Sequence, residues 1–224
     1  ETWQASIPTM EDTFQQGEYW IKLGTILRDR LDRLEDSVIY FTKVLEEQPE
    51  HPGTLEALTE LHAILEDWPA LITTLKAQIE VTPNFTEQVK IAVRVGEIFE
   101  RKLNDQDSAI QAYKDVLELD ERADAALSAL ERLYDEREQW EELIGVLEMQ
   151  IDAFPDREVA KRLRIGQVQC TKMDLSEEAI GTFEAVLDLE PANKEALSEL
   201  ERLYQERNDW EGLVGVYERL LNSS

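Results

Sequence analysis

The side chains that most often carry enzyme chemistry are scarce in this chain of 224 residues. It has two histidines, His51 and His62, and a single cysteine, Cys170. His51 stands beside Pro52 between helical segments, and His62 holds a position that tyrosine holds in two similar segments, which favours a packing ring over a catalytic base. One cysteine forms neither an intrachain disulfide nor a thiolate-rich metal site. No nucleophile elbow, phosphate-binding loop or zinc-binding spacing occurs. We therefore expect no catalytic residues, no metal and no cofactor, and an enzyme would need a domain outside this sequence.

The segment from Asn104 to Asp107 carries oxygen ligands of the kind that calcium prefers. It lacks the glycine and the closing glutamate that a calcium loop requires, so we interpret it as a turn between helices. The other carboxylates are too numerous for any pair to stand out, and solvated helix faces account for most of them.

The charge balance limits the possible partners. Lys and Arg total 23 against 49 Asp and Glu, a formal net charge of −26. Such a field repels nucleic-acid phosphates and anionic lipids, because both kinds of binding depend on clustered Lys and Arg. It keeps an extended surface soluble, and it can also attract a basic protein partner. No apolar run approaches the roughly 20 residues of a membrane span. We expect a protein or peptide partner, no nucleic acid and no membrane insertion.

Internal repetition determines the architecture. Trp68, Trp140 and Trp210 are 72 and 70 residues apart, and Gly24, Gly96 and Gly166 follow the same spacing. The neighbours recur as well, as ALSALERLYDEREQW before Trp140 and ALSELERLYQERNDW before Trp210 show. Self-similarity at a fixed period of this kind is typical of solenoid proteins.

Hydrophobic spacing of three and four residues predicts amphipathic helices throughout, and no run alternates as a strand would. First helices are expected to begin near residues 18, 53, 87, 123, 158 and 194, and their partners near residues 36, 68, 107, 140, 176 and 210. Pro49, Pro83, Pro155 and Pro191 each follow a second helix, which they cannot continue. The pattern predicts six antiparallel helical hairpins, arranged as three alternating pairs.

These residues carry a resemblance to tetratricopeptide (TPR) repeats. Three of the hairpins match the family pattern, with Leu23 and Gly24 then Phe41, with Gly96 then Tyr113, and with Gly166 then Phe183. The resemblance implies an all-α, right-handed α-α solenoid of six TPR-like hairpins. We expect residues 1–16, with Trp3, Ile7 and Pro8, to be the remnant of a preceding helix or an N-terminal extension. Residues 17–224 are expected to form one solenoid of three paired repeats, 17–87, 88–157 and 158–224.

The intervening hairpins depart from the family pattern. Thr59, Glu131 and Glu201 replace the glycine, and leucine replaces the small residue of the second helix, so we expect the distance at which the two helices approach to change there. Each tryptophan opens a second helix in phase with apolar positions on one face, which favours packing between adjacent hairpins over an exposed binding anchor.

The resemblance also implies where a ligand would bind, because TPR-like modules usually select ligands on the concave surface lined by first helices. The corresponding groove candidates are Arg28, Lys90, Val93, Arg101, Arg132, Leu163 and Arg202, with Ile21, Thr25, Ser128, Asp135, Gln167 and Cys170 beside them. Arg132 and Arg202 occupy equivalent positions and can bind carboxylates of an extended or helical peptide. The alternative is that both pair with acids on their own helix surface, such as Glu131 and Glu201.

We expect a non-catalytic scaffold that binds a peptide or helix of a partner protein in its concave groove. The alternative is a structural spacer or self-association element of a large multi-subunit or filamentous assembly, with self-association through the solenoid ends. The expected location is cytoplasmic. The periplasm stays open, because the chain begins with Glu1 rather than Met and we expect the natural N-terminus to lie upstream.

Overall fold

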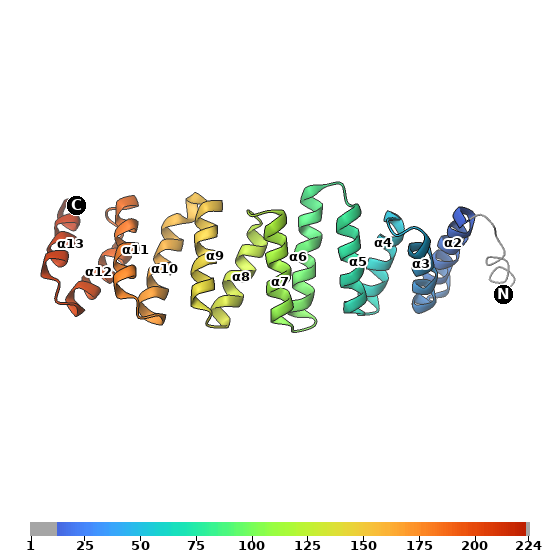
Figure 1. Ribbon diagram of the computed structural model, residues 1–224, viewed down its shortest axis with the longest axis horizontal. Coiled ribbons are helices and arrows are strands. Elements are labelled where there is room, and N and C mark those ends of the chain that lie inside the picture. The colour runs from blue at the N-terminus through green and yellow to red at the C-terminus, as the bar shows by residue number, and fades with distance from the viewer. Residues whose placement is uncertain (1–12, 223–224) are drawn as a thin grey trace. The chain divides into compact units, whose positions relative to one another are not determined.

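The computed structural model describes residues 13–222, and the side chains of residues 15–221. This part of the chain is helical, without strands, and consecutive helices pair as antiparallel hairpins (Figure 1). The first helices of the hairpins are α2 (Thr13–Leu31), α4 (Pro52–Ile64), α6 (Phe85–Arg101), α8 (Asp124–Glu136), α10 (Glu158–Lys172) and α12 (Lys194–Glu206). The second helices are α3 (Leu34–Glu47), α5 (Trp68–Val81), α7 (Gln106–Leu119), α9 (Trp140–Ala153), α11 (Ser176–Leu189) and α13 (Trp210–Asn222). A short 3-10 turn, η2 (Pro155–Arg157), precedes α10.

The predicted fold class, an all-α solenoid of helical hairpins, is confirmed. The helices α5, α9 and α13 begin at the tryptophans, as the periodicity predicts, and α10, α11 and α12 also begin where expected. Helix α2 starts at Thr13, earlier than the expected start near Glu18. Residues 13–16 of the expected remnant lie in α2, and its other residues, with Trp3, Ile7 and Pro8, lie outside the described residues.

The chain divides into two compact units, one ending at Leu119 and the other beginning at Asp120. Unit 1 contains α2 to α7, and unit 2 contains α8 to α13. Within unit 1, α4 packs against α3 and α6 against α5; within unit 2, α10 packs against α9 and α12 against α11. Each unit is therefore a stack in which a hairpin rests on the second helix of the one before it. The pair boundaries after residues 87 and 157 stay a prediction.

The first, third and fifth hairpins, here called the odd hairpins, pack a glycine against an aromatic ring. A Cβ atom on Gly96 would lie 2.6 Å from the ring of Tyr113, and one on Gly166 would lie 2.7 Å from that of Phe183. Both rings are buried, with 2% and 0% of their surface exposed. The ring on the second helix thus occupies the space that a side chain at the glycine would need.

Two of the even hairpins have polar contacts where the odd hairpins pack a glycine against a ring. Glu131 on α8 accepts a hydrogen bond of 2.8 Å from the buried Gln150 on α9, and Thr59 on α4 donates one of 3.2 Å to Gln78 on α5.

The turns inside the hairpins alternate in the same way. Each contains one residue with a left-handed backbone, and in the even hairpins Glu66, Glu138 and Asn208 hold this position at φ of 56°, 55° and 55°. In the turn at Glu138, the N–H of Gln139 donates to the carbonyl of Tyr134 at 2.9 Å, a Schellman closure. In the odd hairpins the closing bond spans one residue more, as from Asp105 N–H to the Phe99 carbonyl at 2.9 Å.

The tryptophans that open α5 and α9 take part in packing between hairpins, as expected. Trp68 lies against a core of α5, α6 and α7 that contains Leu71, Ile72, Leu75, Ile91, Val95, Ile98 and Ala112. The ammonium of Lys102, just after α6, lies 4.8 Å from the Trp68 ring centre, and that of Lys172 lies 5.1 Å from the Trp140 ring centre. The expectation is wrong for Trp210, which is 60% exposed because no helix among the described residues covers that face of α13.

Candidate partner-binding site

The first helices of unit 2 lie side by side and are joined by polar side chains. From η2 and α10, three cations reach acids on α8: Arg157 to Asp124, Lys161 to Glu131 and Arg164 to Asp135, at 2.6, 2.8 and 2.6 Å. On the other side of α10, Gln167 donates to Glu195 of α12 at 2.6 Å. Helices α8, α10 and α12 therefore present one continuous polar face, here called the first-helix face.

The bond between Arg157 and Asp124 is bidentate, with a second contact of 3.2 Å. Hydrogen bonding from this guanidinium lowers the pKa of the Asp124 carboxyl, since it stabilises the ionised form. The other two bridges are single contacts, so Arg157 sets the position of the start of α10 more strictly than they do.

A cleft of about 230 Å³ opens in this face between α8 and α10. Its lining consists of Ser128, Glu131, Arg132, Asp135, Leu143 and Arg164. The predicted trio of Ser128, Arg132 and Asp135 is thus brought together. The cleft offers guanidinium, hydroxyl and carboxylate groups within a small space, which suits a polar peptide segment.

Arg132 is accessible and already paired. Its guanidinium donates to Glu136 at 3.1 Å, one turn along the helix, and 44% of its side chain is exposed. Pairing with a nearby acid of the same helix was the alternative that the sequence left open, and the bond to Glu136 is such a pair. Glu131 is instead engaged with Gln150 and Lys161.

Arg202 repeats this arrangement on α12. It bonds to Glu199 at 2.9 Å and to Glu206 at 2.9 Å, and its side chain is 43% exposed. The hydrogen bond to Glu199 is the largest of the effects that raise the pKa of this guanidinium. A third contact, of 3.5 Å, joins Arg202 to the sulfur of Cys170 on α10. Burial raises the pKa of the Cys170 thiol, which favours its protonated form at neutral pH.

Unit 1 has its own cleft, of about 290 Å³, between α2 and α4. The predicted residues Ile21, Thr25 and Arg28 all line it, together with Glu56 and Glu60 of α4. Arg28 donates to Asp29 at 2.7 Å and reaches Glu60 at 3.5 Å. This cleft is again bounded by two consecutive first helices.

The remaining groove candidates are more scattered. Lys90 is exposed and pairs with Glu87 at 3.3 Å, Val93 is half-buried and Arg101 is exposed at the end of α6. These three lie on α6 and line neither cleft. Leu163 on α10 packs against the core formed with α11 and α12.

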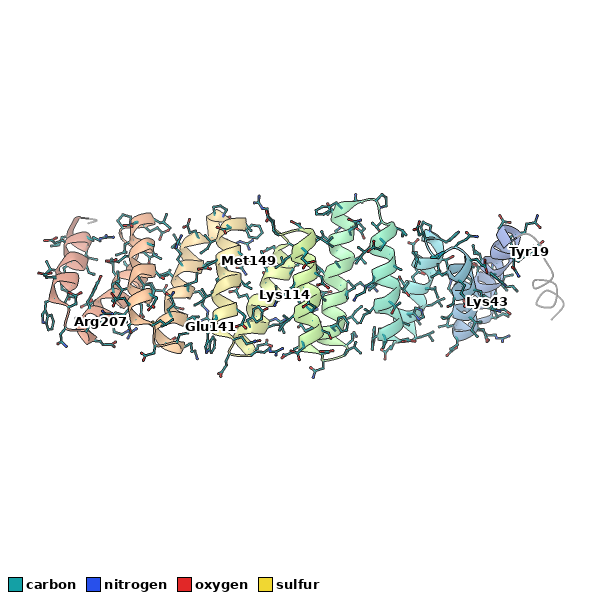
Figure 2. The ribbon with its side chains drawn as sticks, in the orientation of Figure 1. Tyr19, Lys43, Lys114, Glu141, Met149 and Arg207 are labelled. Atoms are coloured by element: carbon teal, nitrogen blue, oxygen red, sulfur yellow. The ribbon has the colours of Figure 1, made fainter. Side chains whose placement is uncertain are left out.

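A further hollow of about 220 Å³ lies at the other end of α8 and α9, lined by Glu121, Arg122, Met149, Asp152 and Ala153 (Met149 is labelled in Figure 2). Arg122 crosses it and donates to the Ala153 carbonyl at 2.7 Å. This bond ties the chain before α8 to the end of α9, which indicates a structural role.

The two histidines hold structural positions. His62 is 8% exposed on α4, and burial lowers its pKa. His51 caps the same helix, its Nδ1 accepting from the backbone N–H of Thr54 at 3.1 Å. Asp105 does the same for α7, accepting from the N–H and hydroxyl of Ser108 at 3.1 and 2.6 Å, so one of the two acids of the segment from Asn104 to Asp107 caps a helix.

No group of three or more His, Cys, Asp or Glu side chains within the described part of the chain is placed to hold a metal ion. Among residues 13–222, no helix has both the length and the apolar character that crossing a membrane requires.

Sequence reasoning missed the cations at the start of α10. Arg157, Lys161, Arg162 and Arg164 fall within eight positions of a chain with few basic residues, and that concentration was the available signal. Three of them bind acids of α8, and Arg162 pairs with Glu158 on its own helix.

Stacked antiparallel hairpins, with first helices forming a common face in unit 2, define the class of α-helical repeat proteins. Two family models, both described as tetratricopeptide repeat, match the chain. One matches residues 126–158 and 196–224, and the other matches residues 17–51 and 89–123. The chain belongs to the tetratricopeptide repeat family, whose members are protein-interaction scaffolds and typically non-catalytic. The first model falls on even hairpins and the second on odd ones, in line with the alternation in packing and turns.

Several solved structures match parts of the chain. A crystal structure of MamA is 17% identical, with 74% of this chain and 94% of that chain covered and a TM-score of 0.44. YrrB, described as a TPR protein with an unusual peptide-binding site, is 16% identical over 88% and 97% of the two chains, with a TM-score of 0.42. A tetratricopeptide repeat protein from Parabacteroides merdae is 16% identical over 99% and 84%, with a TM-score of 0.41. No curated protein sequence matches the chain significantly.

Proposed function

We propose that unit 2 binds an extended or helical segment of a partner protein along the first-helix face of α8, α10 and α12. The observation that carries this proposal is the pair of exposed arginines at equivalent positions of α8 and α12, with the cleft beside Arg132 and α10 between them. Arg132 and Arg202 expose 44% and 43% of their side chains, so both guanidinium groups are within reach of a ligand.

The bonds that these arginines make now do not prevent ligand binding. Exposed ion pairs between neighbours on one helix contribute only about 0–1 kcal/mol each. A ligand carboxylate that replaces Glu136 beside Arg132, in a cleft from which water is displaced, gains more than that, because charge-assisted hydrogen bonds contribute about 1.5–3 kcal/mol. The pairs in the unliganded chain hold the guanidinium groups ready and are exchanged at small cost.

The expected ligand has both signs of charge. Its carboxylates bind Arg132 and Arg202, and its basic groups bind the acids beside them, Asp135, Glu199 and Glu206. The net charge of −26 disfavours a purely acidic segment and accelerates association of one that also carries Lys or Arg.

The test uses two displayed libraries of random peptides, one with all residues and one without Asp and Glu. We expect the full chain to enrich binders from the first library that carry at least one carboxylate and one cation. The double variant Arg132→Glu, Arg202→Glu should weaken these binders by about 100-fold or more, since two charge-assisted contacts are lost and two repulsions added. Capture should also weaken as salt rises, because the contacts are exposed to solvent.

The matched control is Arg219→Glu on α13. Its side chain is 44% exposed, as that of Arg132 is, and it pairs with one acid, Asp188, at 3.2 Å. It lies on a second helix, so binders should be unaffected. Circular dichroism checks that all variants keep the helical content of the parent. Binders that survive the double change, or their absence from both libraries, would show that the first-helix face is not the site.

A further inference from the structure

The exposed face of α13 has the composition of a buried one. Trp210, Val214 and Tyr217 are 60%, 54% and 41% exposed, and Leu221 follows at 76%. They are spaced by four, three and four residues, so they share one side of the helix. Among the described residues, no other helix covers this side.

The same positions are covered inside each unit. On α5, Ile72 and Leu75 correspond to Val214 and Tyr217, and they are only 7% and 1% exposed because α6 packs on them. On α9, Leu147 corresponds to Tyr217 and is fully buried. The exposed face of α13 thus repeats a surface that the next hairpin covers on α5 and on α9.

The other half of this interface recurs as well, on α2. In α6 the covering residues include Val95 and Ile98, one before and two after Gly96, at 3% and 6% exposure. In α10 the equivalents, Ile165 and Val168, are 5% and 1% exposed. In α2 the equivalents are Leu23, which is half-buried, and Ile26, which is 50% exposed.

A cation accompanies each tryptophan in the filled copies. Lys102 and Lys172, each six residues after the glycine of the covering helix, lie over Trp68 and Trp140 at 4.8 and 5.1 Å. The residue six positions after Gly24 is Arg30, which is exposed. An arginine serves a tryptophan ring at least as well as a lysine does, because its guanidinium also stacks on the ring.

The alternation of hairpin types makes the two faces match. The covered faces belong to second helices of even hairpins, and the covering helices are first helices of odd hairpins. Helix α13 is the second helix of an even hairpin, and α2 is the first helix of an odd one. One copy of the chain therefore carries both the face that is covered elsewhere and the helix type that covers it.

We propose that copies of this chain stack head to tail, with α13 of one copy packed on α2 of the next. Arg30 lies over Trp210 of the neighbouring copy, and Leu23 and Ile26 pack against its Val214 and Tyr217. The contact joins two different surfaces, so each addition leaves both kinds of face available for a further copy. This proposal is independent of peptide binding at the first-helix face.

The charge of the chain determines when stacking appears. Copies with a net charge of −26 repel one another, and salt shortens the range of that repulsion to about 3 Å at 1 M. Stacking is mainly apolar, so it strengthens as ionic strength rises, whereas capture of a charged peptide by the first-helix face weakens. The two activities are therefore separable in one titration.

The experiment is analytical ultracentrifugation of the full 224-residue chain at high salt, from micromolar to near-millimolar concentration. We expect a series of species that grows with concentration. Trp210→Glu alone and Ile26→Glu alone should each be monomeric, with the association constant lowered by about 30-fold or more, as loss of a central anchor does. Mixed in equal amounts, the two variants should form dimers and nothing larger, because each still supplies one intact face.

The matched control is Ile64→Glu, which changes an exposed isoleucine at the end of α4, 63% exposed and on neither face. It should assemble as the parent chain does, and so should the double arginine variant of the first-helix face. A parent chain that stays monomeric throughout, or an Ile26→Glu variant that still dimerises through two copies of α13, would overturn head-to-tail stacking.

Discussion

Replacing Gly96 by alanine tests whether close helix approach in the odd hairpins depends on the missing side chain. The new Cβ would lie 2.6, 2.8 and 2.9 Å from three atoms of the Tyr113 ring, where ordinary contact begins at 3.4 Å. The ring cannot move aside easily, because it is 2% exposed and its hydroxyl bonds to Glu100 at 3.1 Å. Either the ring or helix α7 must shift by nearly 1 Å.

Two opposing effects set the magnitude. Alanine in a helix interior is favoured over glycine by about 1 kcal/mol. Overpacking of a well-filled core destabilises by about 1–3 kcal/mol, and the short distances here place Gly96→Ala in the upper half of that range. We expect a net destabilisation of about 1–2 kcal/mol. Gly145→Ala on α9 is the matched control, because nothing lies within 4 Å of its Cβ, and it should stabilise by about 1 kcal/mol.

Hydrogen exchange followed by mass spectrometry is the appropriate assay, because repeat arrays need not unfold as one cooperative unit. Amides of α6 and α7 should exchange about 5–30 times faster in Gly96→Ala, and those of α9 more slowly in Gly145→Ala. In a Tyr113→Leu background the alanine should lose most of its destabilising effect, because the two changes affect one contact. Equal stabilisation by both alanines would refute the reasoning.

Three further predictions concern single side chains. Glu138→Gly should stabilise the chain by about 1 kcal/mol in urea unfolding, since Glu138 holds φ at 55°, whereas Glu136→Gly within α8 should destabilise it by about as much. Burial lowers the pKa of His62, so the unfolded chain binds its proton first and stability falls as pH drops below 6.5. His62→Phe should therefore gain on the parent chain with acidification, by at most about 1.4 kcal/mol per pH unit, and a pH-independent difference would contradict this. Burial and the hydrogen bond to Glu184 raise the pKa of Tyr204 to about 12, so stability should decline as pH rises from 10 through 12, and Tyr204→Phe should remove the step near pH 12 from the ultraviolet tyrosine titration.

The helices were predictable because each depends on a local pattern. A tryptophan after a polar turn, followed by leucine three residues later, marks the start of α5, α9 and α13 without knowledge of the rest of the chain. The turn residues were less accessible. Glycine or asparagine is the usual left-handed residue after a helix, and Glu66 and Glu138 give no such signal.

The candidate site was predictable only in part. The positions of Arg132 and Arg202 followed from the repeat, and so did their exposure. Their pairing with nearby acids of the same helix was one of the two alternatives, but which of those acids the rotamers reach does not follow from the sequence. The bridge from Arg164 to Asp135 spans 29 residues and exists because α10 packs beside α8, which no local pattern reports. The exposure of Trp210 likewise depends on what stands beside α13, not on its own sequence.

The alternation of closely packed and polar-bridged hairpins constrains how such an array can change in length. Removing the residues of a single hairpin would bring two helices of the wrong types together, for instance the second helix of an odd hairpin against the first helix of another odd one. The glycine, the aromatic ring and the tryptophan with its cation would then all be out of phase. Deletion or duplication of two neighbouring hairpins keeps the alternation, so helices of matching types still meet at the new junction. The smallest heritable step for a gene encoding this array is accordingly a double hairpin, and shuffled or designed variants should tolerate even numbers of hairpins far better than odd ones.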